Sequence, residues 1–453
     1  MAFRQLLKTL EVDRAVAYAV AARGWQVLAG PVTMLLIARF LPQETQGYFY
    51  TFGSVLTLQM FFELGLQTVL VNLVAHEWAH LKLEPNGTIS GDALAGSRLA
   101  SLLKFVDRWY SICALMFVVV TGVSGFYFFR SHNSDIEWQA PWWCLTVLTG
   151  LSLRLIPRMA LLEGCHQMRA VNAVRFWQGV CGNAAVWTAI ACHAGLWTAV
   201  VSGAVRLAFE TWLVEVRFRQ LRRGVQALAG EHPISWRDEI WPLQWRIALQ
   251  GLGYWAANNL FNPLMFQYHG AVVAGQMGMT LTLITAIQTA GAAWLSTRVP
   301  VFSELVSKRR FAELDRLLKR LTLVSLGFTA VAAAGVLLGI VGLQAIAPKL
   351  ADRLLPVGPT AVLFGGALVI QILTPQAYNV RAHRIDPFCL LATIAYSATG
   401  CAVWYWGSKN GPLGAALAHL LTLGLCYLPP HTWIWWRVRR ELQVDAEDDV
   451  MKS

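Results

Sequence analysis

Apolar runs of about 20 residues recur along the whole chain, and each is long enough to cross a lipid bilayer as a helix. Such runs fall at 14–39, 47–71, 105–130, 138–160, 168–192, 195–216, 243–267, 271–297, 321–346, 356–378, 386–407 and 412–436. Because about twelve spans fill more than half of the 453 residues, little sequence is left for other domains. The expected fold is an all-α integral membrane protein with about twelve transmembrane helices.

The composition excludes several other classes of protein. Hydrophobic residues make up 56% of the chain and charged residues only 14%, whereas about a quarter of a soluble domain is charged. The eight cysteines show no C-x-x-C spacing. They lie within or at the ends of apolar runs, as expected of cysteines that pack as small apolar residues in helices. A soluble enzyme, a disordered protein and a secreted disulfide scaffold are therefore not expected.

The formal net charge is +11, and the distribution of the basic residues along the chain predicts the membrane topology. The basic residues concentrate in every second loop, that is, in the loops on one side of the membrane, which predicts that these loops and both termini are cytoplasmic. This distribution does not favour a nucleic-acid partner. The segment 302–320 also has an apolar face and a basic face, as expected of a helix lying on an anionic inner leaflet.

A basic connector at 217–242 divides the chain into two expected six-helix lobes. These are an N-terminal lobe over 1–216 and a C-terminal lobe over 243–440, and 441–453 is expected to be a disordered cytoplasmic tail. A shift of 228 residues aligns Gly47 with Gly275, which either indicates an internal duplication or is a chance match. Transporters are often built from such paired halves, with the substrate site at the midplane.

Ionisable residues inside spans are costly and are functional candidates by default. Four arginines and two glutamates lie at membrane depth, all in the first half: Arg23, Arg154, Arg175, Arg206, Glu63 and Glu210. The net positive layer suits a phosphate, because the planar guanidinium donates two parallel hydrogen bonds and stays charged. In the alternative interpretation, Arg23–Glu63 and Arg206–Glu210 are structural pairs, and the other two arginines reach the headgroups.

The second half carries neutral amides in place of charges. Amides suit the hydroxyl groups of sugars, and the candidates for sugar contacts are Gln250, Asn258, Asn259, Asn262 and Gln288.

His76-Glu77-Trp78-Ala79-His80 matches the H-E-x-x-H pattern of zinc hydrolases. Intramembrane metalloproteases pair this motif with an aspartate–glycine motif on a later span, and the chain has no Asp-Gly pair. The motif also falls at the cytoplasmic end of a span, so we expect no metal, no catalysis and an interfacial helix end.

Two segments carry a family resemblance: ARGWQVLAGPVTMLLIARFLPQETQGYFYTFGSVLTLQMFFELGL and WLSTRVPVFSELVSKRRFAELDRLLKRL. They resemble bacterial polysaccharide-unit flippases of the multidrug/oligosaccharidyl-lipid/polysaccharide exporter superfamily. The resemblance implies two six-helix lobes with alternating access. It also implies transfer of a polyprenyl-diphosphate-linked oligosaccharide from the inner to the outer leaflet of the bacterial inner membrane, for O-antigen, capsule or exopolysaccharide assembly.

The resemblance also implies a cationic site for the diphosphate, and Arg23, Arg154, Arg175 and Arg206 are the candidates. Cation-driven transport would use a proton or sodium gradient through Glu63 or Glu210, with no cofactor. Expected partners are the lipid-linked substrate, membrane lipids and other polysaccharide assembly proteins. The alternatives are a cation-coupled multidrug exporter of the same superfamily and a membrane glycan polymerase or ligase.

Overall fold

The computed structural model describes residues 14–63, 65–84, 88–131, 135–228, 237, 241–383 and 385–451. Parts of the expected connector 217–242 and the last two residues of the expected tail lie outside this range. The chain divides into two compact units: Met1–Thr45 with Val55–Gly251, and Gln46–Ser54 with Leu252–Ser453.

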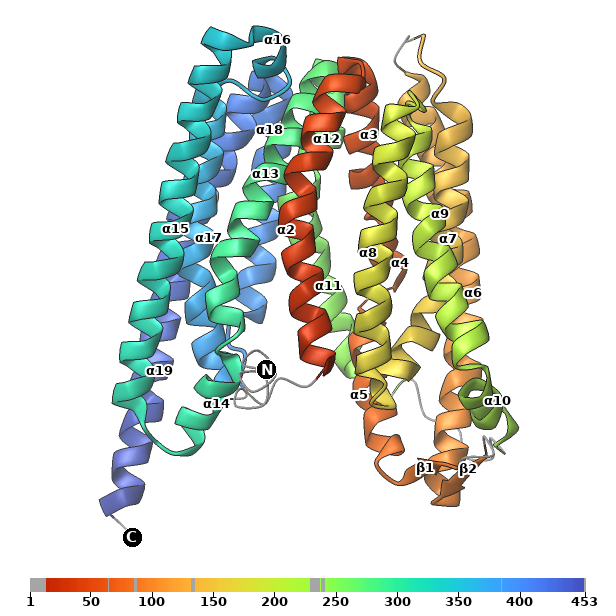
Figure 1. Cartoon of the computed structure of the whole chain (residues 1–453). Coiled ribbons are helices and arrows are strands. Elements are labelled where there is room, and N and C mark those ends of the chain that lie inside the picture. Colours follow the sequence, from red (N-terminus) through yellow and green to blue (C-terminus); the bar gives the residue numbers. More distant parts are fainter. Residues whose placement is uncertain are drawn as a thin grey trace, which may run out of the picture. The chain divides into compact units, whose positions relative to one another are not determined.

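The elements up to residue 259 are mostly helices. They are α2 (Arg14–Phe40), α3 (Gln43–Leu56), α4 (Gln59–Glu63), α5 (Leu66–Trp78), β1 (Leu81–Leu83), β2 (Ile89–Gly91), α6 (Ala93–Arg130), α7 (Gln139–Gly164), α8 (Met168–Ala191), α9 (Trp197–Thr211), the π-helical turn η1 (Trp212–Arg217), α10 (Arg219–Ala227) and α11 (Trp241–Asn259). The two strands pair as an antiparallel hairpin. Figure 1 shows this hairpin and α10 at the same end of α6.

The elements described after residue 259 are all helical. They are α12 (Phe261–His269), α13 (Ala271–Ser296), α14 (Val299–Ser307), α15 (Phe311–Ile346), α16 (Pro348–Ala351), α17 (Val357–Ala382), α18 (Cys389–Leu421), the π-helical turn η3 (Thr422–Tyr427) and α19 (Leu428–Met451). In this unit α14 lies at one end of α15 and α16 at the other (Figure 1).

Seven helical stretches among the described residues are long and apolar enough to cross a membrane. Other expected spans fall on interrupted helices: 47–71 comprises α3, α4 and α5, and 243–267 comprises α11 and α12. The last two expected spans are joined at Gly411, whose φ of 63° and ψ of −150° break α18 before Pro412. The predicted fold class, an all-α multi-pass membrane protein, is confirmed.

Two local features differ from the sequence predictions. The helix α19 continues to Met451, so 441–451 is helical where the sequence predicts a disordered tail. The expected amphipathic helix at 302–320 is split, because α14 ends at Ser307 and α15 runs on from Phe311 into a span.

The first unit has its core where α5, α6 and α7 meet. Tyr110, Phe117 and Leu153 are completely buried there. Trp142 packs against α6 and donates a hydrogen bond from Nε1 to the carbonyl of Gly122 at 3.0 Å. A β-carbon at Gly125 would lie 2.0 Å from the indole, so this packing requires glycine.

The second unit includes residues 46–54 from the middle of α3. Gln46 Nε2 donates to the carbonyl of Gly275 at 2.9 Å, and Asn262 Nδ2 donates to Ser54 Oγ at 2.8 Å. This segment therefore packs with α12 and α13, although it precedes the second half of the sequence. The lobe boundaries expected at 1–216 and 243–440 stay a sequence prediction.

Candidate functional site

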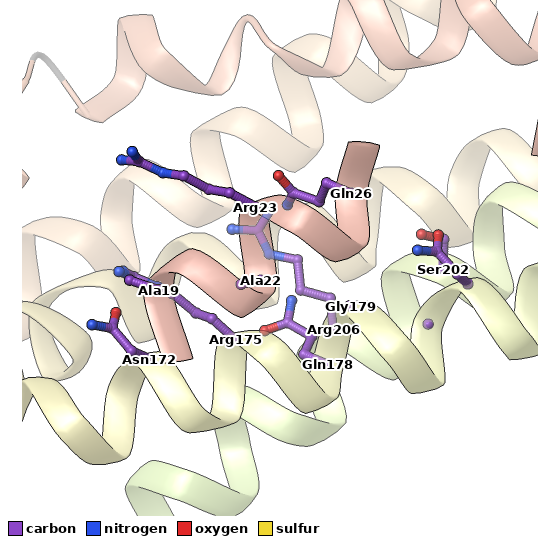
Figure 2. Close-up of a pocket in the computed structure, with 12 residues that line it drawn as sticks. Ala19, Ala22, Arg23, Gln26, Asn172, Arg175, Gln178, Gly179, Ser202 and Arg206 are labelled. Atoms are coloured by element: carbon purple, nitrogen blue, oxygen red, sulfur yellow. The ribbon is translucent and has the colours of Figure 1, made fainter. Parts of the chain in front are cut away.

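A polar cavity of about 430 Å³ lies in the first unit between α2, α8 and α9 (Figure 2). On α8, Asn172, Arg175, Gly179 and Gly182 recur every three or four residues, so they share one face of the helix. The α2 helix packs on α8, and α8 packs on α9. The cavity forms because the two glycines leave space on α8 where longer side chains would fill it.

Three arginines from three helices line this cavity: Arg23 on α2, Arg175 on α8 and Arg206 on α9. Figure 2 shows the side chains of Arg23 and Arg175 extending in the same direction from their helices. Neutral donors and acceptors complete the lining, namely Gln26, Asn172, Gln178, Asn183 and Ser202. None of the described residues that line the cavity is a carboxylate, so its walls carry three positive charges and favour an anion.

The three arginines differ in their partners. Arg175 forms an ion pair with Glu163, and Arg206 Nε lies 2.9 Å from Glu210 Oε1. Within the described part of the chain, no ion pair is recorded for Arg23. Among the described residues, Arg23 is therefore the cavity arginine whose charge is least compensated by carboxylates.

A second cavity, of about 350 Å³, shares Arg175, Gln178 and Arg206 with the first. Its other walls include both carboxylates identified in the sequence, Glu63 and Glu210. The two cavities therefore share one wall. Arg206 is part of this wall, with the first cavity, which favours an anion, on one side and the second cavity, which holds Glu63 and Glu210, on the other.

Glu63 is placed by the break between α4 and α5. It is the last residue of α4, and it lines the second cavity together with Arg206. Arg23 lines the first cavity and Glu63 the second. No ion pair joins Arg23 to Glu63 among the described residues, and the arginines that line a cavity with Glu63 are Arg175 and Arg206. The expected Arg206–Glu210 pair is present.

Arg154 is exposed on α7 and lines neither cavity. The structure thus brings together three of the four arginines proposed from the sequence. All four arginines are exposed, so what separates Arg154 from the others is its place on α7, outside the lining of both cavities.

The amides proposed for sugar contacts lie elsewhere, because Gln250, Asn258, Asn259, Asn262 and Gln288 line neither cavity. Asn262 is buried and bonded to Ser54, and Asn258 Nδ2 donates to the carbonyl of Tyr254 at 2.9 Å. The backbone carbonyl of Gln288 accepts from Gln371. Their role toward sugars stays a prediction.

Sequence reasoning missed the neutral polar residues of the cavity, Gln26, Asn172, Gln178, Asn183 and Ser202. Their spacing carries a signal: Gln26 follows Arg23 by three residues, Asn172 precedes Arg175 by three and Ser202 precedes Arg206 by four. Residues three or four apart lie on one helix face, so the arginines could have been used to find them.

The H-E-x-x-H motif lies at the end of α5. Glu77 is buried, and its Oε1 accepts a hydrogen bond from Arg98 Nε at 2.9 Å. His76 is exposed beside it. The glutamate thus joins α5 to α6 through an ion pair.

The fold is similar to those of solved transporters. The structure titled lipid II flippase MurJ, in an inward closed conformation, aligns with a TM-score of 0.64 and 13% identity, over 91% of this chain and 86% of that one. An inward-facing multidrug resistance MATE family transporter of the MOP superfamily aligns with a TM-score of 0.55 and 10% identity, over 93% and 99% of the two chains.

A third structure, that of the MATE multidrug transporter DinF-BH, aligns with a TM-score of 0.54 and 10% identity, over 95% and 96% of the chains. No protein-family model matches the chain, and no curated protein matches its sequence. At these identities the similarity establishes the fold, and the function must be argued from the cavity.

Proposed function

We propose that this chain is a flippase that moves a polyprenyl-diphosphate-linked oligosaccharide from the inner to the outer leaflet of the bacterial inner membrane. The observation that carries the proposal is the cavity lined by Arg23, Arg175 and Arg206, with no carboxylate among the described lining residues. The product would feed O-antigen, capsule or exopolysaccharide assembly, together with other assembly proteins. Both termini would be cytoplasmic.

The physical argument concerns the diphosphate. Its charges cannot cross hydrocarbon unaided, and arginines replace part of its hydration with charge-assisted hydrogen bonds. The amides and hydroxyl around them, including Gln26, Asn172 and Ser202, suit sugar hydroxyls next to the diphosphate. No covalent chemistry is needed, because alternating access to a fixed site moves the substrate across.

The similarity to the lipid II flippase structure supports a lipid-linked substrate. In this proposal the polyprenyl tail stays in the lipid, so only the polar part needs a cavity inside the protein. A volume of about 430 Å³ accommodates a diphosphate with the first sugar.

Glu63 and Glu210 are the proposed coupling carboxylates. Both line the second cavity with Arg206, which also lines the first. A proton or a sodium ion on either carboxylate would weaken its hold on Arg206 and leave the guanidinium for the diphosphate. Ion binding and substrate binding would then be linked through one side chain.

The second candidate is a cation-coupled multidrug exporter. The carboxylates of the second cavity favour it, because they offer negative charge to a cationic drug. Similarity to the two multidrug transporters supports it as well. The two candidates predict ligands of opposite charge.

A binding measurement on the purified full-length protein separates them. A polyprenyl-diphosphate oligosaccharide should bind, and Arg23→Gln and Arg206→Gln should each weaken binding at least about tenfold. A lipophilic cationic dye should bind weakly and show no dependence on either arginine. Tight dye binding that is lost in Glu63→Gln, without diphosphate binding, would replace the flippase with the exporter.

A further inference from the structure

A third cavity lies in the second unit, away from the arginine cavity. It measures about 330 Å³ and is formed by α15, α17 and α19. Most of its lining is apolar, from Leu318, Leu323, Ile372, Pro375 and Trp435. Leu323 is 60% exposed, so the cavity opens onto an apolar surface of the unit.

Charged side chains stand at one end of this cavity. Lys319 is exposed on α15, and Arg439 on α19 forms an ion pair with Asp315. The lining charges sum to one excess positive charge. Further exposed arginines follow Asp315 on α15 and Trp435 on α19, among them Arg320 and Arg440.

The geometry of α15 places these charges at a membrane interface. Leu314 and Leu318 are buried against Phe302 of α14, and the residues from Leu321 onward form an apolar span. Lys319 is therefore in the last turn before the span, where a lysine reaches the headgroup layer.

The aromatic residues of α19 lie at the same level. Trp435 Nε1 donates to Asn379 Oδ1 at 3.0 Å, which fixes the indole as one wall of the cavity. The guanidinium of Arg440 lies 3.5 Å from the ring centroid of Trp436. Tryptophans with adjacent arginines are typical of helix ends at the membrane surface.

We infer that this cavity binds an anionic phospholipid, with its phosphate at Lys319 and Arg439 and an acyl chain against Leu323 and Ile372. An apolar cavity with basic residues at its interfacial end matches a lipid in both polarity and charge. In the topology predicted from the basic loops, this end lies at the inner leaflet. This inference does not depend on which substrate the arginine cavity carries.

Native mass spectrometry of the full-length protein tests the inference, with phosphatidylglycerol and phosphatidylcholine of identical acyl chains as probes. Wild-type protein should retain one phosphatidylglycerol in preference to phosphatidylcholine. Lys319→Gln should weaken that binding about fivefold, the effect of losing one basic contact to an anionic lipid. Thr322→Phe should also weaken it by filling the cavity, because Thr322 lines the cavity and its hydroxyl donates to the carbonyl of Leu318 within its own helix.

Two control variants separate this site from others. Lys349→Gln removes an exposed lysine at the α16 end of the unit, and Arg23→Gln removes a charge from the arginine cavity. Both should bind phosphatidylglycerol as wild type does. Free glycerol phosphate should not compete, since it lacks the acyl chain. Equal retention of both lipids, or wild-type binding by both Lys319→Gln and Thr322→Phe, would overturn the inference.

Discussion

Arg206 Nε lies 2.9 Å from Glu210 Oε1, one turn further along α9. Arg206 lines two cavities, and Glu210 lines only the second of them. The guanidinium of Arg206 therefore lies in the wall that the two cavities share, with its charge compensated by Glu210. Neutralising Glu210 would leave more of the positive charge of Arg206 for an anion in the first cavity.

This pair gives the first prediction. Arg206→Gln should weaken binding of the lipid-linked diphosphate by about 10- to 100-fold, the loss expected for one charged hydrogen-bond partner. Glu210→Gln should leave binding unchanged or tighten it, because Arg206 loses its competing partner. Arg206→Lys keeps the charge but loses the planar guanidinium, so its affinity for the diphosphate should lie between those of wild type and Arg206→Gln. Titration of purified variants checks the order, and weaker binding in Glu210→Gln than in Arg206→Gln contradicts it.

The second prediction compares Arg23 with Arg154. Arg23 lines the cavity and has no recorded ion pair in the described residues, so Arg23→Gln should abolish transport while the protein still inserts. Arg154 lines neither cavity, so Arg154→Gln should keep most activity. Surface polysaccharide in complemented deletion cells, normalised to membrane protein, measures both. Equal loss in the two variants would mean that the cavity does not define the site.

The third prediction fills the cavity without changing its charge. A β-carbon at Gly182 would have only Val205 nearby, at 3.9 Å, so Gly182→Leu should fold and should block transport. Gly24→Leu is the matched control, since Gly24 has open space around it and does not line the cavity. Transport by Gly182→Leu at the level of Gly24→Leu would exclude this cavity as the substrate path.

The fourth prediction concerns stability of the second unit. A β-carbon at Gly47 would lie 1.9 Å from the carbonyl oxygen of Ala271, so Gly47→Ala should lower the free energy of unfolding by about 1–3 kcal/mol. Gly53, on the same helix, has nothing within 4 Å, and Gly53→Ala should be neutral or slightly stabilising. Thermal unfolding in detergent compares them, and equal midpoints would contradict the close approach of α3 and α13.

The fifth prediction tests whether the H-E-x-x-H motif has a structural role or a catalytic one. Glu77→Ala should destabilise the protein by about 1–3 kcal/mol, because it removes the buried carboxylate to which Arg98 donates. His76→Ala should change stability by less than about 0.5 kcal/mol, since the side chain is exposed. Neither variant should change zinc content. Stoichiometric zinc in wild-type protein that is lost in His76→Ala would restore the metalloprotease hypothesis.

Several features of the fold were predictable from local pattern. Apolar runs predict transmembrane spans because each run must match the bilayer thickness. Charged residues inside such runs are easy to recognise in the sequence because they are rare and costly there. Arg23, Arg175 and Arg206 were found in this way. Gly411 and Pro412 could likewise be read as the turn between the last two spans.

Other features depend on how the helices rotate and pack. Arg154 has the same sequence signal as Arg175, but its position on α7 puts it outside both cavities. The ion pair of Arg175 with Glu163 joins α8 to α7, and no local pattern specifies it. The same holds for residues 46–54, which pack in the second unit through Gln46 and Ser54.

In the proposed function, the chain moves a lipid-linked oligosaccharide across the membrane. The most direct test is mass spectrometry of lipids extracted from cells that lack the gene, with a probe for the leaflet that holds the lipid-linked units. If the proposal holds, complete polyprenyl-diphosphate oligosaccharides should accumulate on the inner leaflet while surface polysaccharide is lost, and wild-type protein but not Arg23→Gln should reverse both. An unchanged lipid-linked pool with normal surface polysaccharide would contradict it.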